Sequence, residues 1–291
     1  MGVVNITPDS FSDGGSFLHP EAAVAHALGL LDEGADLLDL GAESTRPGAK
    51  VSGADGAGPS PAVSSDEELA RLLPVLEGIL RARPEAILSI DTYKAETARA
   101  ALAAGAEIIN DVSGFCWDRE LAAVCAEAGC GVALMHTRGR PDEWGTQPQL
   151  PPDALLETVR AGLENSMKKA AAAGIAAESI VLDPGYGFGK RGEENFALLA
   201  RQSELLALGR PLLTGVSRKS FLGRALAPLY RGKTAPVEER ETASVAAMAA
   251  SILHGASIVR MHRVRAAVEA SLVADALAKA DDRLQRTTDR K

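Results

Sequence analysis

Aromatic and cysteine side chains are scarce in this chain, and both shortages limit the classes of protein to which it can belong. Phe, Trp and Tyr together make up 4% of the 291 residues, so a buried core must be built from Ala, Val, Ile and Leu. The three cysteines, Cys116, Cys125 and Cys130, form an odd set without the spacing of a metal site. They are typical of reduced thiols in a cytoplasmic protein rather than of disulfides in a secreted one.

Long apolar runs and an excess of basic charge are also missing. No run approaches the ~20 apolar residues of a membrane span, and the start, MGVVNITPDS, lacks the basic and apolar regions of a signal peptide. We therefore expect a cytoplasmic location and no membrane partner. The net charge of -8 disfavours a nucleic-acid partner but allows an anionic small molecule, because the field inside a pocket is local. The sequence has no Walker loop, zinc pattern or G-x-S-x-G elbow.

One stretch, Ala86 to Ser113, contains the pattern that organises the whole chain. Its first apolar run ends at Asp91, and a helical repeat of apolar residues follows until Gly105 ends it. A second apolar run, Ile108–Ile109, ends at Asn110. Runs that are apolar throughout are typical of parallel strands covered by helices. Because such folds bind ligands at the carboxyl ends of their strands, Asp91 and Asn110 are the first candidate site residues.

The same alternation of strand and helix recurs along the chain. Strand patterns occupy Met1–Ile6, Leu37–Gly41, Ile87–Asp91, Ile108–Asp111, Gly131–Met135, Ile180–Asp183, Pro211–Val216 and Ile258–Met261. Helical patterns occupy Pro20–Glu33, Asp66–Ala82, Lys94–Ala104, Arg119–Ala128, Pro152–Ala173, Glu193–Leu206, Glu239–His254 and Arg265–Ala280. A glycine separates a helix from the next strand at Gly34, Gly105, Gly129, Gly174 and Gly255.

This alternation predicts an α/β protein that is a single-domain (β/α)8 TIM barrel, whose usual size is about 250 residues. A doubly wound open sheet has the same alternation and is the alternative fold. The barrel is favoured because the first and last strands both end in polar residues, as a closed ring requires. We expect the barrel domain to span residues 1–280 and residues 281–291 to form a solvated tail.

Two long polar segments, Asn5 to Phe17 and Glu43 to Ser65, follow the first and second strands. Both lie on the side where barrel enzymes bind their substrates. We therefore expect them to be mobile loops that close over a site, with disordered surface as the alternative.

Polar residues stand at almost every predicted strand end. They are Asn5, Glu43, Asp91, Asn110, His136, Asp183, the run Ser217 to Lys219, Arg260 and His262. Taken singly, each has a structural explanation: Asp91 caps a helix, for example, and Lys219 is a solvated charge. Taken together, they converge on one rim if the barrel is right, and this favours a shared site.

The chemistry of these residues divides into two groups. Asp91, Asn110 and Asp183 offer the carboxylates and amide that suit a flat heterocycle with donors and acceptors. Arg260 and His262 are two residues apart on a predicted strand, so their side chains share a face. Ser217, Lys219 and Ser220 follow the seventh predicted strand. The loops after strands seven and eight are the common phosphate site of this fold. A heterocycle pocket beside an anion site is therefore predicted.

Eight segments carry a more specific signal. They are GVVNITPDSFSDGG (Gly2–Gly15), ESTRPGA (Glu43–Ala49), SIDTYKAETARAAL (Ser89–Leu102), IINDVSG (Ile108–Gly114), LMHTRGRP (Leu134–Pro141), LDPGYGFGK (Leu182–Lys190), GVSRKSFLG (Gly215–Gly223) and IVRMH (Ile258–His262). In this order they resemble the dihydropteroate synthases, pterin-binding TIM-barrel enzymes of folate synthesis. The resemblance implies a transferase that joins 6-hydroxymethyl-7,8-dihydropterin diphosphate to 4-aminobenzoate and releases 7,8-dihydropteroate and diphosphate. It also implies Mg2+ as cofactor and a homodimer.

The resemblance also implies roles for individual residues. Catalysis is expected of Asn5, Asp91, Asp183, Lys219, Arg260 and His262. The pterin contacts are Asp91, Asn110, Asp183 and Lys219, and the diphosphate contacts are Asn5, Arg260 and His262, with Asn5 also meeting the metal. Further substrate contacts are Thr45, Arg46 and Pro47 in the second loop, Met135, Gly187, Phe188, and Ser217 with Ser220 near the aminobenzoate carboxylate. Asp9, Phe11 and Ser12 belong to the first loop.

Two departures from the family pattern stand next to predicted site residues, and two alternative functions stay open. Ala42 stands where the family usually has Gly, and Arg263 follows His262 where Asp is common. One alternative is a pterin-dependent methyltransferase serving a corrinoid protein, which shares the pterin-facing residues but does not need the basic pair at Arg260 and His262. The other is a catalytically silent paralogue that binds a pterin.

Overall fold

Eight parallel strands form the centre of the molecule. The computed structural model describes residues 1–6, 20–43 and 63–288, with side chains described as far as residue 280. The strands are β1 (Gly2–Asn5), β2 (Leu37–Gly41), β3 (Ile87–Asp91), β4 (Ile108–Asp111), β5 (Gly131–Met135), β6 (Ile180–Asp183), β7 (Leu212–Thr214) and β8 (Ala256–Val259). They are hydrogen-bonded in sequence order, each parallel to the next.

The sheet closes on itself just beyond β8. Gly2 forms a parallel bridge with Met261, and the Val3 N–H donates to the Met261 carbonyl at 3.1 Å. The Met261 N–H in turn donates to the Met1 carbonyl at 3.0 Å. The predicted (β/α)8 barrel is therefore confirmed, and the open doubly wound sheet is wrong.

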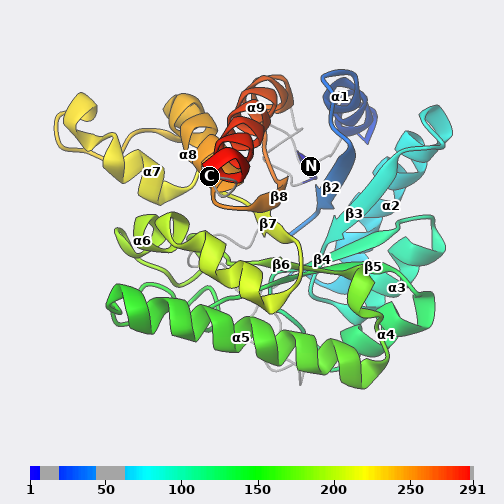
Figure 1. Ribbon diagram of the computed structural model, residues 1–291. Helices are drawn as coiled ribbons and strands as arrows, with labels where there is room; N and C mark the ends of the chain where they lie inside the picture. The colour runs from blue at the N-terminus through cyan, green and yellow to red at the C-terminus, as the bar shows by residue number, and fades with distance from the viewer. Residues whose placement is uncertain (7–19, 44–62, 289–291) are drawn as a thin grey trace.

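Helices surround the strands (Figure 1). The α-helices are α1 (Pro20–Asp32), α2 (Ser65–Ala82), α3 (Ala95–Ala103), α4 (Leu121–Ala128), α5 (Pro152–Ala173), α6 (Glu194–Ala200), α7 (Ser220–Ala225), α8 (Glu241–Leu253) and α9 (Val264–Thr288). Short 3-10 helices are η1 (Ala177–Ser179), η2 (Gln202–Leu208), η3 (Ala227–Tyr230) and η4 (Val237–Arg240). The five glycines predicted to separate helix from strand all have positive φ, between 64° at Gly129 and 109° at Gly105.

The strands are mostly apolar on both faces, because one face meets the helices and the other fills the barrel; Asp39 and Ser89 are buried polar exceptions. Leu38, Leu40, Leu88, Ile109 and Leu182 are all fully buried in one core cluster. The polar strand-end residues follow these apolar runs, so the barrel presents them together at its carboxyl end.

Several element boundaries differ from the sequence prediction. The helix predicted over Glu193–Leu206 divides at Arg201 into α6 and η2. The division places Gln202 in the core, where its side-chain oxygen accepts from the Tyr186 hydroxyl at 2.8 Å and from the Thr214 hydroxyl at 2.7 Å. A tertiary contact of this kind has no periodic signal.

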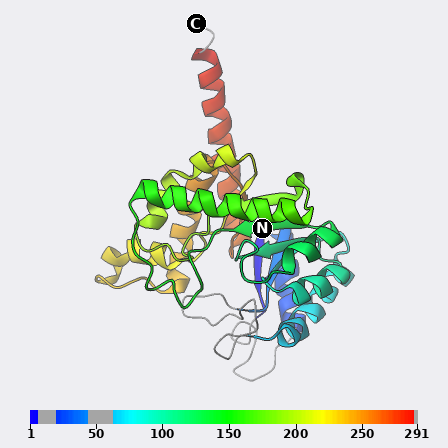
Figure 2. The ribbon, with the colours of Figure 1, turned by 90° about the horizontal axis from the view of Figure 1, so that it is seen from below.

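The end of the chain differs as well. β8 starts and ends two residues before the predicted Ile258–Met261, and β7 is shorter than the predicted Pro211–Val216. The short helices α7, η3 and η4 were not predicted. α9 continues past the predicted end at Ala280 to Thr288 and extends well beyond the other helices (Figure 2). The division into a domain of residues 1–280 and a tail of residues 281–291 stays a prediction.

The two long loops predicted to be mobile, over Asn5 to Phe17 and Glu43 to Ser65, lie largely outside the described residues. The residues that flank the second one are joined by Lys94 at the start of α3. Its ammonium lies 2.8 Å from a Glu43 carboxylate oxygen, 3.0 Å from Glu68 and 2.7 Å from the Val63 carbonyl. Because Lys94, Glu43 and Glu68 are all buried, this ion-pair cluster holds the end of β2 against α2 and α3.

The turn after β6 depends on Gly185, and this dependence can be tested. Gly185 has a φ of 72°, and a Cβ there would lie 2.0 Å from the His136 carbonyl oxygen. We expect Gly185→Ala to lower the free energy of unfolding by about 2–4 kcal/mol, from left-handed strain and overlap together. Urea unfolding monitored by circular dichroism measures this change.

Gly209→Ala is the matched control, because Gly209 has a φ of 69° but no atom within 4 Å of an added Cβ. We expect it to cost about 1–2 kcal/mol, from the left-handed backbone alone. Equal losses in the two variants would show that the contact with His136 does not constrain the turn.

Candidate functional site

Arg260 directly follows β8 and is the centre of a buried ion-pair network at the carboxyl end of the barrel. Its Nε lies 2.6 Å from Asp39 Oδ2, and its Nη2 lies 2.9 Å from Asp91 Oδ2. Asp39 is fully buried within β2, and Asp91 ends β3. The network thus joins the last segment of the barrel to its second and third strands, as the closed ring allows.

Asp39 collects two further hydrogen bonds. Its Oδ1 accepts from the Ser89 hydroxyl at 2.7 Å, and its Oδ2 accepts from Asn110 Nδ2 at 3.0 Å. Asn110 lies on β4 and is 4% exposed. The structure therefore brings the predicted residues Asp91, Asn110 and Arg260 together, through a carboxylate that was not among the predicted site residues.

Asp183 and Lys219 complete the charged group. Asp183 ends β6, and its Oδ1 accepts from the Gly185 N–H at 2.7 Å. The Lys219 ammonium lies 3.8 Å from the centre of the Phe188 ring, a cation–π contact. Both carry charges that act on each other and on Arg260. The expected acidic and cationic residues thus meet at one mouth.

Burial shifts the pKa values of these groups toward neutrality. Burial raises the pKa of Asp91 to about 7, although the positive charge of Arg260 opposes the shift. Burial also raises the pKa of Asp183. Burial, together with the charge of Arg260, lowers the pKa of Lys219 to about 8. The mouth therefore holds acids with raised pKa values beside a base with a lowered one, an arrangement typical of functional sites.

His262 lies beside the loop after β7. Its Nδ1 is 2.9 Å from the Ser217 hydroxyl oxygen, which also accepts from the His262 N–H at 3.3 Å. The prediction placed Arg260 and His262 on the last strand, but β8 ends at Val259 and both residues lie beyond it. Ser220 is exposed at the start of α7, and Asn5 ends β1 beside Gly41 of β2.

An apolar cluster stands next to the charged residues. It consists of Tyr93, Val112, Trp117, Met135 and Trp144, with Phe188 packed against it. The rings meet edge to face, Tyr93 with Trp117 at 5.1 Å and Trp144 with Phe188 at 4.9 Å between centroids. Of this upper apolar cluster, only Met135 and Phe188 were predicted site residues. It contains both tryptophans of a chain poor in aromatics, a concentration that could have indicated the cluster.

A second set of buried charges shapes the loop after β6. Lys190 donates to the carbonyls of His136 at 2.9 Å and Phe188 at 3.3 Å, and Arg138 lies 3.1 Å from Glu194. Burial holds the pKa of the Lys190 ammonium well below its usual range. These contacts hold Phe188 and Gly187 in place near Lys219. The charged residues that make them, Lys190, Arg138 and Glu194, were not among the predicted site residues.

Some predicted residues lie outside the described part of the chain. They are Thr45, Arg46 and Pro47 of the second loop and Asp9, Phe11 and Ser12 of the first. Their roles stay predictions. The two family departures lie at the edge of the site: Ala42 is buried and its carbonyl accepts from Arg71 at 3.0 Å, whereas Arg263 is exposed.

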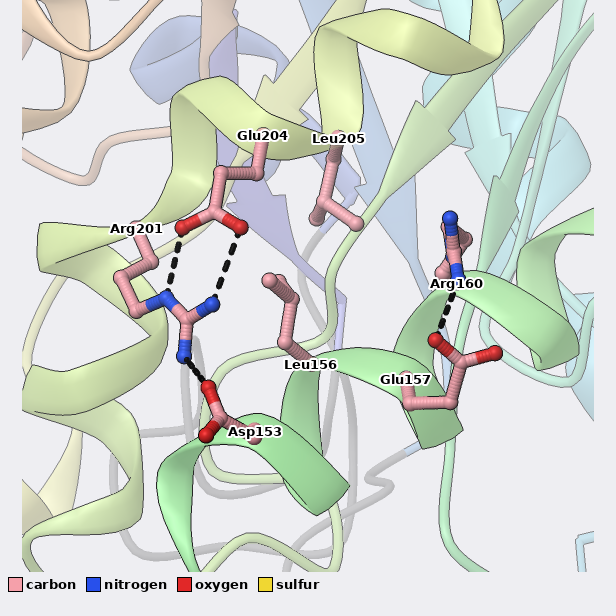
Figure 3. A pocket seen from close by; sticks show the side chains of 7 residues that line it. All are labelled: Asp153, Leu156, Glu157, Arg160, Arg201, Glu204 and Leu205. Carbon is pink, nitrogen blue, oxygen red and sulfur yellow. Dashed lines mark hydrogen bonds and ion pairs between the residues drawn. The ribbon is translucent and has the colours of Figure 1, made fainter.

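A surface hollow between α5 and η2 lies apart from the strand ends (Figure 3). Its Arg201 is held by Asp153 at 2.5 Å and Glu204 at 2.6 Å, and Arg160 pairs with Glu157. Because both of its arginines are already held by carboxylates, neither is free for an anionic ligand. The charged residues at the barrel mouth are therefore the better candidate site.

The described residues include no group of three His, Cys, Asp or Glu side chains placed to hold a metal ion. None of the helices they form is long and apolar enough to cross a membrane.

Comparison with known proteins identifies the family. The model of the family described as pterin binding enzyme matches residues 1–262, which include the whole barrel mouth. The chain belongs to the pterin binding enzyme family. A dihydropteroate synthase of Mycobacterium leprae (strain TN) is 44% identical over 288 residues, covering 98% of this chain and 95% of that protein.

Solved structures agree with this assignment. Xanthomonas albilineans dihydropteroate synthase with 4-aminobenzoic acid is 40% identical, has a TM-score of 0.81 and covers 95% of this chain and 91% of its own. Yersinia pestis dihydropteroate synthase in complex with a sulfonamide drug is 38% identical, has a TM-score of 0.83 and covers 96% of this chain and 93% of its own. Both confirm the fold and the predicted resemblance.

The low pKa of Lys219 predicts how stability depends on pH. Between pH 8 and 10.5 the folded state releases this proton and the unfolded state keeps it, so the free energy of unfolding rises with pH over that window. From pH 7 to 10.5, we expect the free energy of unfolding of the wild type to rise relative to that of Lys219→Met by on the order of 3 kcal/mol, because the variant lacks the titrating group. Urea unfolding at intervals across this range measures it.

Lys233→Met serves as the matched control, because Lys233 is exposed. Its difference from wild type should stay constant within about 0.5 kcal/mol over the same range. A constant difference for Lys219→Met as well would contradict the lowered pKa of Lys219.

Proposed function

We propose that this chain is a dihydropteroate synthase. It joins 6-hydroxymethyl-7,8-dihydropterin diphosphate to 4-aminobenzoate and releases 7,8-dihydropteroate and diphosphate. The observation that carries this proposal is the mouth itself, where Arg260 and Lys219 stand against Asp91 and Asp183 beside an apolar aromatic wall. Near full-length similarity to named dihydropteroate synthases favours this function over a methyltransferase or a silent paralogue.

The acidic and amide groups suit the pterin. Asp91, Asp183 and Asn110 offer oxygens to the ring's N–H and amino groups, and Lys219 offers a donor to its oxygen or ring nitrogen. The upper apolar cluster, through Met135 and Phe188, supplies a surface for the flat ring, with Gly187 allowing close approach. Carboxylates on one side of the ring also favour positive charge that develops on it.

The basic groups suit the diphosphate. Arg260 and His262 lie at the phosphate-binding side of the barrel, after β8. We infer a dissociative displacement: the carbon–oxygen bond breaks, its electron pair leaves with the diphosphate, and a cation forms on the pterin's methylene carbon. The amine of 4-aminobenzoate then forms the carbon–nitrogen bond and loses a proton. A requirement for 4-aminobenzoate before any carbon–oxygen cleavage would count against this order.

The second substrate is assigned to the loop side. Ser217 and Ser220 stand after β7, where they could meet the aminobenzoate carboxylate, and Thr45, Arg46 and Pro47 are assigned to the closing second loop. Exclusion of water by such closure would protect the cation from capture.

Mg2+ is proposed as the cofactor. Asn5 offers one amide oxygen at the end of β1, and an oxygen ligand of this kind suits a Mg2+ that is held mostly by substrate phosphates. Bound there with the diphosphate, Mg2+ would neutralise charge on the leaving group.

A cytoplasmic homodimer completes the proposal. Leu272, Val273 and Leu277 on α9 are more than half exposed, and such an apolar surface suits a second copy of the chain. Sedimentation velocity should then give about twice the monomer mass of 30.3 kDa. A monomer at all concentrations would exclude the dimer.

Turnover tests the proposed function directly. The purified chain, both substrates and Mg2+ should produce 7,8-dihydropteroate and diphosphate in equal amounts. Omitting 4-aminobenzoate should abolish formation of dihydropteroate. Calorimetric binding of the pterin diphosphate without any product would instead indicate the silent paralogue, and methyl transfer to a corrinoid protein would indicate the methyltransferase.

Two substitutions test the division of roles between the pocket and the second loop. Asp183→Ala should weaken binding of the pterin diphosphate about 10- to 100-fold, because it removes a charge-assisted hydrogen bond. Arg46→Ala should change that affinity by less than about threefold and mainly lower kcat, since its assigned role is in the closed complex. Equal losses of pterin affinity in calorimetry would contradict the assignment.

A further inference from the structure

Asp39 has an unusual position for a residue outside the predicted set. It is fully buried in the middle of β2, yet its two oxygens accept from three side chains. Those side chains come from β3, β4 and the segment after β8. Two of them, Asn110 and Arg260, are assigned to the substrates, whereas Ser89 is fully buried below the mouth.

The bond to Asn110 determines which end of its amide is offered to a ligand. A carboxylate only accepts, so the group 3.0 Å from Asp39 Oδ2 must be the Asn110 NH2. The amide oxygen, Oδ1, then points the other way and has no partner among the described residues. Asn110 is therefore set as an acceptor, which suits an N–H or amino group of a bound heterocycle.

The bond to Arg260 determines the plane of the guanidinium. Nε is held by Asp39 at 2.6 Å and Nη2 by Asp91 at 2.9 Å, and two contacts on a planar fork fix its orientation. Nη1 has no partner among the described side chains and remains available to an anion. Without Asp39, the guanidinium would be held at one nitrogen and could rotate about its contact with Asp91.

We propose that Asp39 is a positioning residue of the substrate site, which sets Asn110 as an acceptor and fixes the plane of Arg260. The identity of the ligand in this inference rests on the proposed function. Asp39 itself is fully buried and acts through these two side chains rather than by contact with substrate.

Two substitutions of Asp39 separate its geometry from its charge. Asp39→Leu removes every acceptor, and we expect it to raise the Kd for the pterin diphosphate about 10- to 100-fold. Asp39→Asn keeps one oxygen for Arg260 and Asn110, because its NH2 can donate to the Ser89 hydroxyl. Its Kd should lie between those of wild type and Asp39→Leu, as partial rescue by a conservative variant requires.

Asp111 provides the matched control for loss of a buried carboxylate. It is fully buried on β4, and its oxygens accept from the backbone N–H groups of Ser113 at 2.7 Å and Phe115 at 2.6 Å, with the Ser113 side chain also close, so its partners lie in its own loop and not in the substrate site. Asp111→Asn should lower Tm while the Kd of the folded protein stays within about threefold of wild type. Calorimetry well below each variant's Tm measures affinity separately from stability.

Steady-state kinetics supplies a second readout that a merely structural role would not move. Asp39→Leu should raise KM for the pterin diphosphate by about 10-fold or more and leave KM for 4-aminobenzoate within about threefold. If Asp39→Leu does not fold, a double variant that combines Asp39→Leu with Arg260→Met is used instead, because it leaves no unpaired guanidinium in the core. Its affinity is compared with that of Arg260→Met alone. Pteroic acid is then the probe, and the double variant should bind it about 10-fold more weakly.

The outcomes distinguish this inference from the proposed function. Wild type that binds no pterin diphosphate would overturn the proposed function. Wild type that binds it, with folded Asp39→Leu of equal affinity and equal KM, would overturn the role of Asp39 alone. A pterin affinity that falls for Asp111→Asn as much as for Asp39→Leu would also overturn it, since any buried carboxylate would then have the same effect.

Discussion

The ion pair between Arg260 and Asp39 is the interaction on which the mouth of this barrel depends. It joins residues 221 positions apart and spans the closure between the last segment and the second strand. Because Asp39 is fully buried, its charge requires a partner, and Arg260 is drawn into the ring of strands to supply it. Asp91 and Asn110 are then placed around the same guanidinium and carboxylate.

Burying charged groups at the mouth costs folding stability but favours ligand binding. The barrel below the mouth is closely packed aliphatic core, whereas its upper end buries Asp91, Asp183 and Lys219 at a cost that shifts each pKa toward neutrality. The same desolvation strengthens each charge's interaction with a ligand that excludes the remaining water. The apolar strands support the site because they hold these charged groups where water cannot solvate them.

Local sequence signals predicted most of the fold and much of the site. The glycines after helices, the apolar strand runs and the polar strand ends each come from neighbouring residues, so β2 to β6 fall where the patterns place them. Asp91, Asn110, Asp183, Lys219 and Arg260 were named from their positions at strand ends. Elements without a local signal were missed. α7 is only six residues long, and the helix breaks before Gln202 because the Gln202 side chain accepts hydrogen bonds from Tyr186 and Thr214.

By itself the sequence determined the alternation of strands and helices and, through motif resemblance, the family, because periodicity and short motifs are properties of contiguous residues. Only the tertiary structure decided that the ring closes through Gly2 and Met261 and that Asp39 is the shared partner of Arg260, Ser89 and Asn110. An aspartate in the middle of an apolar strand gives no local sign of its partners, since they come from strands that become its neighbours only when the barrel forms.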